Sequence, residues 1–340
     1  MGVTLADIAQ RAGVSTAAAS LVLSGQYQGR VSEKRAESIR QIAEEMQYVR
    51  NDLAQGLRTK TTRTLGFVTD TVATTPYAVD MIAAATAEAR AAGYLLMLIE
   101  TGGDRRTLED AFRNLRSRHV DGIAFAPMYH HEVALPEDSG SDVIVVNGYP
   151  ANRSITSAIP DEVQGAYDAT TFLLDHGHRR IAYISESSSI DAGPLRIEGF
   201  RKAFETKNLP VSDDLIVHTE TAYHDRIDAE VAALLRSHRP PTAFFCFNDA
   251  TAMGVYRTAA RLGLSIPHDI SVVGFDNLEL LATNVAPMLT TVQLPHRAMA
   301  QWGIQTLIEW HEGGLRQING SPIRFACPLV VRDSVAIVRS

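Results

Sequence analysis

The stretch LADIAQRAGVSTAAASLVL, residues 5–23, predicts two short helices joined by a tight turn. Gly13 can adopt the left-handed conformation that ends a helix, and Ser15 is a good N-cap for the helix that follows it. Small residues on the facing sides would let the two helices approach closely. These features are typical of a helix-turn-helix, whose second helix enters the DNA major groove. An ordinary helical hairpin is the alternative that these residues leave open.

The charge distribution supports the DNA-binding interpretation. A third helix is predicted from Glu33 to about Tyr48, with Ser32 as its N-cap. Residues 1–63 carry nine Lys or Arg and six Asp or Glu, a balance of +3, whereas the whole chain has a net charge of −7. A basic head on an acidic body fits a DNA-binding module joined to a domain with another task.

Length and composition indicate a soluble protein with more than one domain. At 340 residues the chain exceeds a single core, and 45% hydrophobic with 21% charged residues is ordinary for a soluble globular protein. The start MGVTLADIAQ lacks a secretion signal, and no apolar run reaches the roughly 20 residues of a membrane helix. Cys246 and Cys327 are expected to be buried free thiols. We therefore expect a cytoplasmic protein without a metal site or a membrane segment.

From Thr64 onward, apolar strand-like runs alternate with amphipathic helical segments. The first series predicts strands at 64–70, 94–100, 121–127 and 142–148, with helices at about 79–92 and 105–118. The second predicts strands at 180–185, 215–220, 242–249 and 270–277, with helices at about 161–176, 194–207, 225–238 and 249–262. This alternation predicts two doubly wound parallel-sheet subdomains. Ligands of such sheets bind at the carboxyl ends of the strands, so we expect a binding cleft between the subdomains.

The sequence offers little support for an enzyme. No Gly-x-Gly-x-x-Gly follows a strand, and neither a Walker lysine nor a nucleophile-elbow pattern is present, so no cofactor is expected. His130 and His131 fall in a loop, and His176 and His178 at a helix exit, where structural or solvated roles are expected. A sugar-modifying enzyme on a similar scaffold would need a catalytic carboxylate pair or a bound metal, and the sequence indicates neither.

The segment VRNDLAQGLRTKTTR, residues 49–63, resembles the hinge helix of the LacI/GalR family of transcription factors. The head resembles that family in TLADIAQRAGVS and VSEKR, and the body in GHRRIAYI, PLRIEGFRKAF, FNDATAMGVYRTAARLGLSIPHDISVVGFDN and LVVRDS. The resemblance spans essentially the whole chain. It implies a helix-turn-helix head at 1–50, a hinge helix and linker at 51–61, and an effector-binding and dimerisation domain, related to periplasmic binding proteins, at 62–340. It also implies three crossings, which divide that domain into subdomain one (62–160 plus 291–321) and subdomain two (161–290 plus 322–340).

The resemblance also implies a DNA-binding surface. In the family, paired hinge helices insert a leucine into the minor groove, and Leu57 holds that position. Base reading would fall to the second helix, where Thr16, Ala17 and Leu21 cannot grip guanine in a bidentate manner. More specificity is therefore expected from the hinge and from DNA shape. The implied DNA-binding residues, phosphate contacts included, are Thr4, Ser15, Thr16, Ala17, Ser20, Leu21, Arg30, Asn51, Ala54 and Leu57.

An effector site is implied between the subdomains. Arg196 matches the arginine that grips ligand oxygens with its planar fork, although an ion-pair role between domains is the alternative. Asn248 and Asp276 could instead cap loops, and Asp249 is expected to N-cap the helix that follows it. The effector is expected to be a sugar or sugar derivative, with nucleosides and other polar metabolites left open. The other implied contacts are Tyr77, Asn147 and Tyr223.

Together these features predict a sequence-specific transcriptional regulator, which we expect to act as an effector-controlled repressor. No heptad pattern follows the last expected strand, VAIVRS at 335–340, so a homodimer on a pseudo-palindromic operator is expected. The alternative is a solute-binding protein of a sugar transporter. The body alone permits that function, but the helix-turn-helix and the missing signal peptide oppose it.

Overall fold

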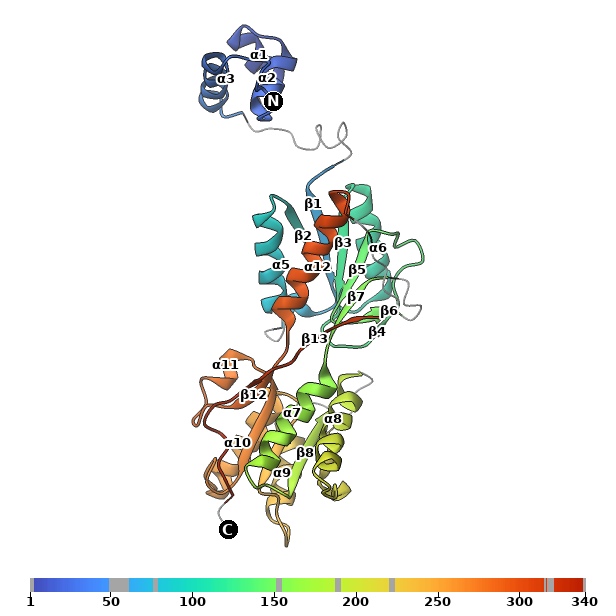
Figure 1. The fold of residues 1–340 in the computed structure, drawn as a ribbon, viewed down its shortest axis with the longest axis vertical. Coiled ribbons are helices and arrows are strands. Elements are labelled where there is room, and N and C mark those ends of the chain that lie inside the picture. Colours follow the sequence, from blue (N-terminus) through green and yellow to red (C-terminus); the bar gives the residue numbers. More distant parts are fainter. Residues whose placement is uncertain are drawn as a thin grey trace. The chain divides into compact units, whose positions relative to one another are not determined.

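The computed structural model describes residues 3–48, 61–75, 79–150, 155–186, 191–219, 224–314, 316 and 321–338. The chain forms two compact units, residues 1–62 and 63–340 (Figure 1). Five positions of predicted function lie outside the described residues: Asn51, Ala54, Leu57, Tyr77 and Tyr223. The hinge helix and two of the predicted effector contacts therefore stay predictions.

The first unit contains the predicted helix-turn-helix. Its helices are α1 (Leu5–Ala12), α2 (Thr16–Leu23) and α3 (Glu33–Glu45). Gly13 ends α1 in the left-handed region at φ 62°, and the Ser15 hydroxyl accepts a hydrogen bond from the backbone N–H of Ala18 over 3.2 Å. Two details differ from the prediction: α3 ends three residues earlier, and Ser32 makes no side-chain capping hydrogen bond. The core consists of Ile8, Ala9, Ala19, Val22, Ala36, Ile39 and Ala43.

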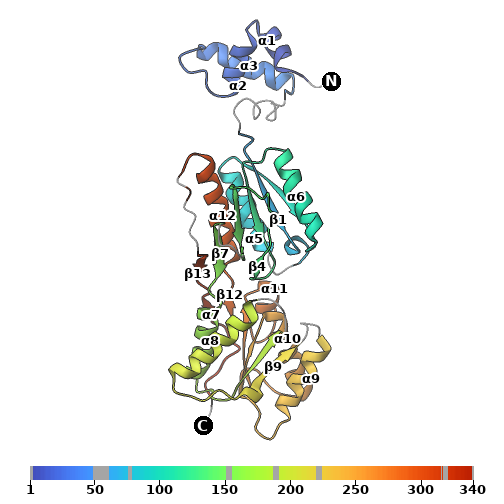
Figure 2. The ribbon, with the colours of Figure 1, turned by 90° about the vertical axis from the view of Figure 1, so that its right-hand side faces the viewer.

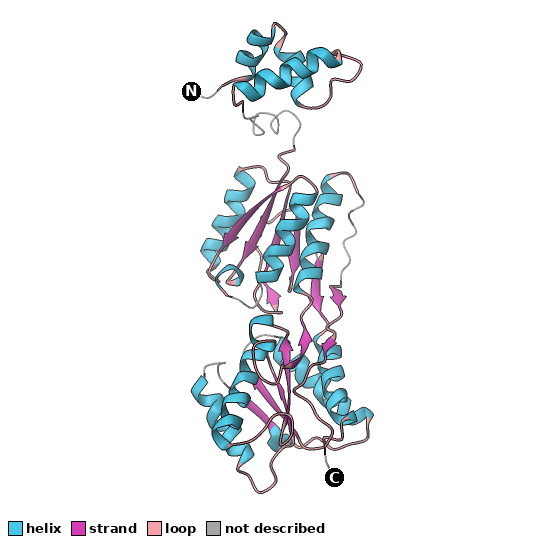
Figure 3. Cartoon of the chain, turned by 90° about the vertical axis from the view of Figure 1, so that its left-hand side faces the viewer, coloured by secondary structure: helices cyan, strands magenta, loops and turns pink. Residues whose placement is uncertain are grey.

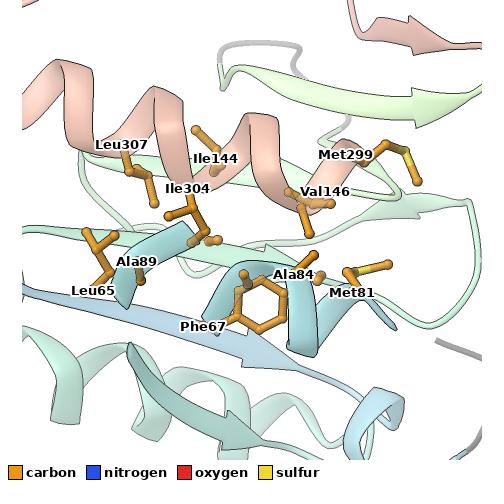
Figure 4. Close-up of a cluster of buried hydrophobic side chains, with 14 of the residues drawn as sticks. Leu65, Phe67, Met81, Ala84, Ala89, Ile144, Val146, Met299, Ile304 and Leu307 are labelled. Atoms are coloured by element: carbon orange, nitrogen blue, oxygen red, sulfur yellow. The ribbon is translucent and has the colours of Figure 1, made fainter. Parts of the chain in front are cut away.

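The second unit begins with a six-stranded sheet in the order β13-β7-β5-β3-β1-β2, in which neighbouring strands are parallel. Helices α5 (Val79–Ala91) and α12 (His296–His311) cover one face, where Figure 4 shows their side chains meeting those of β1 and β5. Helix α6 (Arg105–Ser117) covers the other face (Figure 2). The strands are β1 (Thr64–Thr69), β2 (Leu95–Glu100), β3 (Gly122–Ala126), β5 (Val143–Val146), β7 (Ser157–Pro160) and β13 (Ile323–Phe325). Outside this sheet lie η1 (Val72–Thr74) and the small pair β4 (Glu132–Val133) and β6 (Tyr149–Pro150).

A second six-stranded sheet has the order β14-β12-β11-β10-β8-β9, with β14 antiparallel to β12. Helices α7 (Glu162–Asp175) and α8 (Ala192–Thr206) cover one face, and α9 (His224–Leu235) and α10 (Asp249–Leu262) cover the other. Figure 3 shows each sheet between its two helical layers. The strands are β8 (Ile181–Glu186), β9 (Ile216–Thr219), β10 (Ala243–Cys246), β11 (Ser271–Asp276), β12 (Thr290–Gln293) and β14 (Leu329–Val330). Two short elements, η2 (Asp213–Leu215) and α11 (Glu279–Ala282), complete this part.

The two doubly wound subdomains were predicted correctly. The observed ends of the predicted strands and helices differ from the predicted ends by three residues or fewer. The expected strand VAIVRS is wrong, because its described residues, 335–338, form no strand. Isolated hydrogen bonds hold this segment in place of a regular ladder. The Ser271 hydroxyl accepts from the N–H of Ala336, and the N–H of Val338 donates to the carbonyl of His176.

The chain crosses between the subdomains three times, after β7, after β12 and between β13 and β14 (Figure 1). Two of the predicted boundaries need correction. Residues 291–293 belong to the second sheet, because β12 pairs with β11, and residues 323–325 belong to the first, because β13 pairs with β7. These strands are three or four residues long, and their hydrophobicity does not indicate which sheet they join.

The crossings orient both sheets toward the boundary between the subdomains. Strand β7 leaves the first sheet at its carboxyl end, and the chain continues into α7 of the second subdomain. Strand β12 leaves the second sheet at its carboxyl end, and the chain continues into α12 of the first subdomain. Because the neighbouring strands of each parallel array run in the same direction, their carboxyl ends also face this boundary. This is the edge at which open parallel sheets bind ligands. Among the described residues, no helix is long and apolar enough to cross a membrane.

Candidate functional site

The head presents the start of its second helix as an accessible surface. Thr16 and Ala17 are exposed at the start of α2, and Ser20 and Leu21 are half-buried one turn later. Arg30 is exposed in the loop that follows. The two remaining DNA-binding candidates already act as N-caps. Ser15 caps α2, and Thr4 caps α1 by exchanging hydrogen bonds with Asp7.

An anchor in the loop after α2 was not predicted. The hydroxyl of Tyr27 donates to the carboxylate of Glu33 over 3.0 Å, and the guanidinium carbon of Arg40 lies 4.9 Å from the centroid of the Tyr27 ring. The backbone N–H of Arg30 donates to the carbonyl of Tyr27. These contacts fix the loop on α3 and thereby hold Arg30 at the surface. An aromatic residue in a turn-rich loop was the available signal.

Three predicted effector residues lie at carboxyl ends of strands: Asn147 after β5, Asn248 after β10 and Asp276 at the end of β11. Asn147 has φ 69° and Asp276 has φ 103°, conformations that side-chain-bearing residues rarely adopt. Such strain persists where the surrounding structure enforces it, and it concentrates at binding sites. The Asn147 amide donates to the carbonyls of Pro127 and Met128, within its own subdomain.

Arg196, in the first turns of α8, is enclosed by other residues. Its side chain is 3% exposed, and its Nε donates to Oε2 of Glu162, which is 1% exposed, over 2.7 Å. Nη2 lies 3.3 Å from Oε1 of the same carboxylate and 3.8 Å from Oδ1 of Asp276, while Nη1 donates to the carbonyl of Phe247. The guanidinium carbon also lies 3.6 Å from the centroid of the Phe275 ring. Arg196 and Asp276 are thus brought together, and the structure adds Glu162, which was not predicted.

The neighbouring carboxylates affect the pKa of Arg196 more strongly than its burial does. Burial alone would lower the pKa of Arg196, but the carboxylates of Glu162 and Asp276 raise it well above its usual range. Arg196 therefore stays charged, as a guanidinium does in nearly all proteins. A buried pair of this kind is stable only while both partners are present.

Residues of the first subdomain reach this cluster from across the boundary. The imidazole Nδ1 of His130 lies 4.0 Å from Oε1 of Glu162, and the Tyr149 hydroxyl donates to the carboxylate of Asp191. The N–H of Asp191 also donates to the carbonyl of His130. His130 is 3% exposed, and neither of its ring nitrogens has a hydrogen-bond partner among the described residues. A solvated role for His130 is excluded by its burial, and the structural role that was the other expectation stays a prediction.

The N-cap of α10 is Asn248 and not Asp249 as expected. The Asn248 side chain caps α10, accepting from the N–H and the hydroxyl of Thr251 over 2.8 Å. Asp249 is not the N-cap. Its carboxylate accepts from the Thr291 hydroxyl over 2.5 Å and from the Leu278 N–H over 2.7 Å, joining α10 to β12 and to the residues after β11. Burial raises the pKa of Asp249 to about 7, although both hydrogen bonds favour the charged form.

Comparison with known proteins places both units in one family. Residues 4–51 match "Bacterial regulatory proteins, lacI family", and residues 62–315 match "Periplasmic binding proteins and sugar binding domain of LacI family". The repressor PurR of Vibrio vulnificus is 32% identical over 98% of both chains. The regulator DegA of Bacillus subtilis is 31% identical over 88% of both. The lac repressor dimer, solved bound to operator and an anti-inducer, superposes with a TM-score of 0.81 at 22% identity, over 99% of this chain and all of that one, and supports the fold.

The match over the head favours a regulator over a transport binding protein, because a solute-binding protein has no use for a helix-turn-helix. The two relatives named above are themselves transcriptional regulators and match along most of their length. The chain is a DNA-binding transcriptional regulator and belongs to the LacI family.

Proposed function

We propose that this chain is a homodimeric repressor whose affinity for a pseudo-palindromic operator is set by a small polar effector, a carbohydrate or a derivative of one, bound between the two subdomains. The observation that carries this proposal is the polar cluster at the boundary, where His130 and Tyr149 of one subdomain meet Glu162 and Asp191 of the other. A ligand that binds there can favour one arrangement of the subdomains over another.

The proposed DNA contacts are the exposed residues of α2 together with the hinge. Thr16 and Ala17 would read base edges, and Arg30 would contact a phosphate. Ser20 and Leu21 extend the α2 surface, and Thr4 and Ser15 support it as caps while contacting the backbone of the duplex. In the hinge, Asn51, Ala54 and Leu57 would form the minor-groove helix, with Leu57 as the wedge between base steps.

The homodimer would bury apolar side chains that a single chain exposes. Leu95 and Leu98 of the edge strand β2 are 64% and 42% exposed, and Val79 of α5 is 55% exposed. In the second subdomain, Leu280 and Met288 are 64% and 42% exposed. Exposed apolar side chains on an edge strand and on the start of a helix are suited to an interaction surface. A two-fold interface would use the same surface on both copies.

Operator binding tests the proposal directly. Full-length protein used to select binders from random-sequence DNA should enrich a pseudo-palindrome, and Leu57→Ala should weaken binding to that sequence without changing effector affinity. Arg30→Ala should weaken binding to all sequences and reduce the salt dependence by about one phosphate contact. The matched control is Arg106→Ala, an exposed arginine of the second unit. Selection that yields no common sequence would refute the proposal.

The dimer is tested separately by analytical ultracentrifugation. Leu95→Glu should shift the protein toward monomer. Val331→Glu introduces the same charge at a side chain that is 56% exposed in the second subdomain, and it should leave the mass unchanged. A Leu95→Glu protein that still sediments as the wild type would exclude β2 from the interface.

A further inference from the structure

The boundary cluster restricts the charge of the effector. The inference rests on the proposed function, because it concerns the ligand of that same boundary. Its starting point is the arginine. A free arginine fork grips a carboxylate or phosphate through two parallel N–H donors. In this chain the Nε and Nη2 donors of Arg196 are directed at the two oxygens of Glu162, at 2.7 Å and 3.3 Å. The bidentate edge of the fork is therefore occupied by the protein itself.

The other end of the Arg196 fork also faces protein oxygens, one of which accepts a hydrogen bond from it. Nη1 donates to the carbonyl of Phe247, and Nη2 lies 3.8 Å from the carboxylate of Asp276. The Phe275 ring lies against the guanidinium, 3.6 Å from its carbon to the ring centroid. A ligand anion at this place would have to displace Glu162, which is 1% exposed, into a poorly solvated position.

The local charge balance opposes an anion as well. Arg196 contributes one positive charge, while Glu162 and Asp276 contribute two negative charges. Asp191 adds a further carboxylate beside Tyr149. Burial lowers the pKa of His130 despite these acids, so its imidazole is neutral at pH 7 and adds no positive charge.

His130 shows that polar capacity remains unfilled beside these acids. Its ring nitrogens have no hydrogen-bond partner among the described residues, although the side chain is 3% exposed and Nδ1 lies 4.0 Å from the Glu162 carboxylate. Buried polar groups without partners are rare in native proteins and each asks for an explanation. A neutral imidazole accepts one hydrogen bond and donates one, which suits a hydroxyl group.

We propose that the effector is an uncharged, hydroxyl-rich compound, and that Glu162, by occupying the Arg196 fork, excludes phosphorylated and carboxylated ligands. Hydroxyls can donate to the carboxylates of Glu162 and Asp276 and can exchange hydrogen bonds with His130. A phosphate or carboxylate at the same place offers acceptors to a site that already holds an excess of acceptors.

The experiment uses matched sets of ligands on the full-length protein. Each set shares one sugar ring: glucose with glucose 6-phosphate, glucuronate and glucosamine, the same four forms of galactose, and ribose with ribose 5-phosphate. Thermal shift identifies binders, because a ligand well above its Kd raises the melting temperature, and isothermal titration gives each Kd. We expect a neutral sugar to bind, with its phosphate or uronate at least tenfold weaker. An anionic member that binds as tightly as its neutral counterpart would overturn the inference, and so would a panel in which no neutral sugar binds.

Charge-removing variants test the cause. Glu162→Gln should release the Arg196 fork and reduce the discrimination against the anion about tenfold. The matched control is Asp175→Asn at the other end of α7, roughly 20 Å away along the helix, where the carboxylate pairs with Lys207 at the surface. Asp276→Asn serves as a second variant if circular dichroism shows that Glu162→Gln does not fold. Unchanged discrimination in a folded variant of either kind would overturn the role of the acids.

The outcomes separate this inference from the proposed function. If an anion binds and changes operator affinity, the regulator stands and the inference on charge falls. If a neutral sugar binds without changing operator affinity, the inference stands and the proposed regulation falls.

Discussion

A buried histidine lies at each end of the parallel strands of the second sheet, and the two differ in their hydrogen bonding. We call the end at which the strands begin the amino edge and the end at which they finish the carboxyl edge. His178 lies just before β8, at the amino edge, and His130 reaches the carboxyl edge from the other subdomain; each is 3% exposed. The His178 ring lies 2.9 Å from the Thr242 hydroxyl through Nδ1 and 3.2 Å from the Ala336 carbonyl through Nε2. Both nitrogens of His178 are therefore satisfied, whereas both nitrogens of His130 have no partner among the described residues.

The difference separates residues that stabilise the second sheet from residues that are suited to binding a ligand. At the amino edge, polar side chains replace missing ladder hydrogen bonds and attach the segment at 335–338 to the sheet. At the carboxyl edge, the structure retains a left-handed Asp276, a buried ion pair and an imidazole that has no hydrogen-bond partner in the described part of the chain. Departures of this kind from local consistency are expected where a protein binds a ligand.

The largest effect is expected from breaking the buried pair at the carboxyl edge. Arg196→Met leaves the Glu162 carboxylate buried without its cation, and we expect the free energy of unfolding to fall by about 3–5 kcal/mol. Urea denaturation measures it. The double variant Arg196→Met/Glu162→Gln should recover part of the lost stability. The control is Arg201→Met on the same helix α8, which removes an exposed ion pair with Asp213 and should cost less than about 1 kcal/mol. Equal losses for Arg196→Met and Arg201→Met would contradict the assignment.

Asp249 provides a pH test at the same edge. Its folded-state pKa of about 7 lies above the ordinary value of 3.8, so the folded protein holds a proton between these values that the unfolded chain releases. Stability contributed by this group is present below about pH 4 and is lost as the pH rises toward 7. Asp249→Asn should remove this fall, which is on the order of 4 kcal/mol, from the unfolding free energy measured between pH 4 and 8. The prediction fails if the difference between variant and wild type is independent of pH.

At the amino edge, His178→Phe should cost about 1–3 kcal/mol, because it removes the ring nitrogens that contact the Ala336 carbonyl and the Thr242 hydroxyl. Burial lowers the pKa of His178 to about 4, below its ordinary 6.5. The unfolded chain therefore binds the proton first, and the wild type loses stability as the pH falls from 6.5 toward 4. The variant should lack that part of the acid sensitivity. Parallel pH profiles for the two proteins would show that His178 is not its source.

The smallest effect on the free energy of unfolding is expected from a substitution of His130, the histidine at the carboxyl edge. His130→Phe replaces an imidazole that the described residues leave without a hydrogen-bond partner by an apolar ring, so the free energy of unfolding should change by less than about 1 kcal/mol. Sugar binding, measured by titration, should weaken if His130 contacts the effector. A loss of stability as large as that of His178→Phe would mean that the two edges do not differ in the way described.

Local signals in the sequence determined the head and the alternation of the body. A left-handed glycine, a serine cap and small facing residues suffice for the turn between α1 and α2, because all of these act within a few residues. Apolar runs broken by amphipathic segments were enough to predict two doubly wound sheets, since burial on both faces leaves a continuous apolar strand. The hinge and the effector contacts came from resemblance, and the resemblance indicated Arg196 and Asp276 without indicating what surrounds them.

Tertiary structure alone decided the rest. Glu162 and Arg196 are 34 positions apart, and nothing around either residue indicates that they share one buried ion pair. The short strand β13 pairs with β7, which lies nearly half the chain away in sequence. The open edge of the first sheet determines where β13 pairs, and its own three residues do not indicate it. His130 is buried in the folded chain, where it contacts Glu162 of the other subdomain. Hydrophobic periodicity and helix capping act over a few residues, so they can be recognised in the sequence. Buried ion pairs, strand pairing and desolvation depend on segments that are distant in sequence and come into contact only in the folded chain.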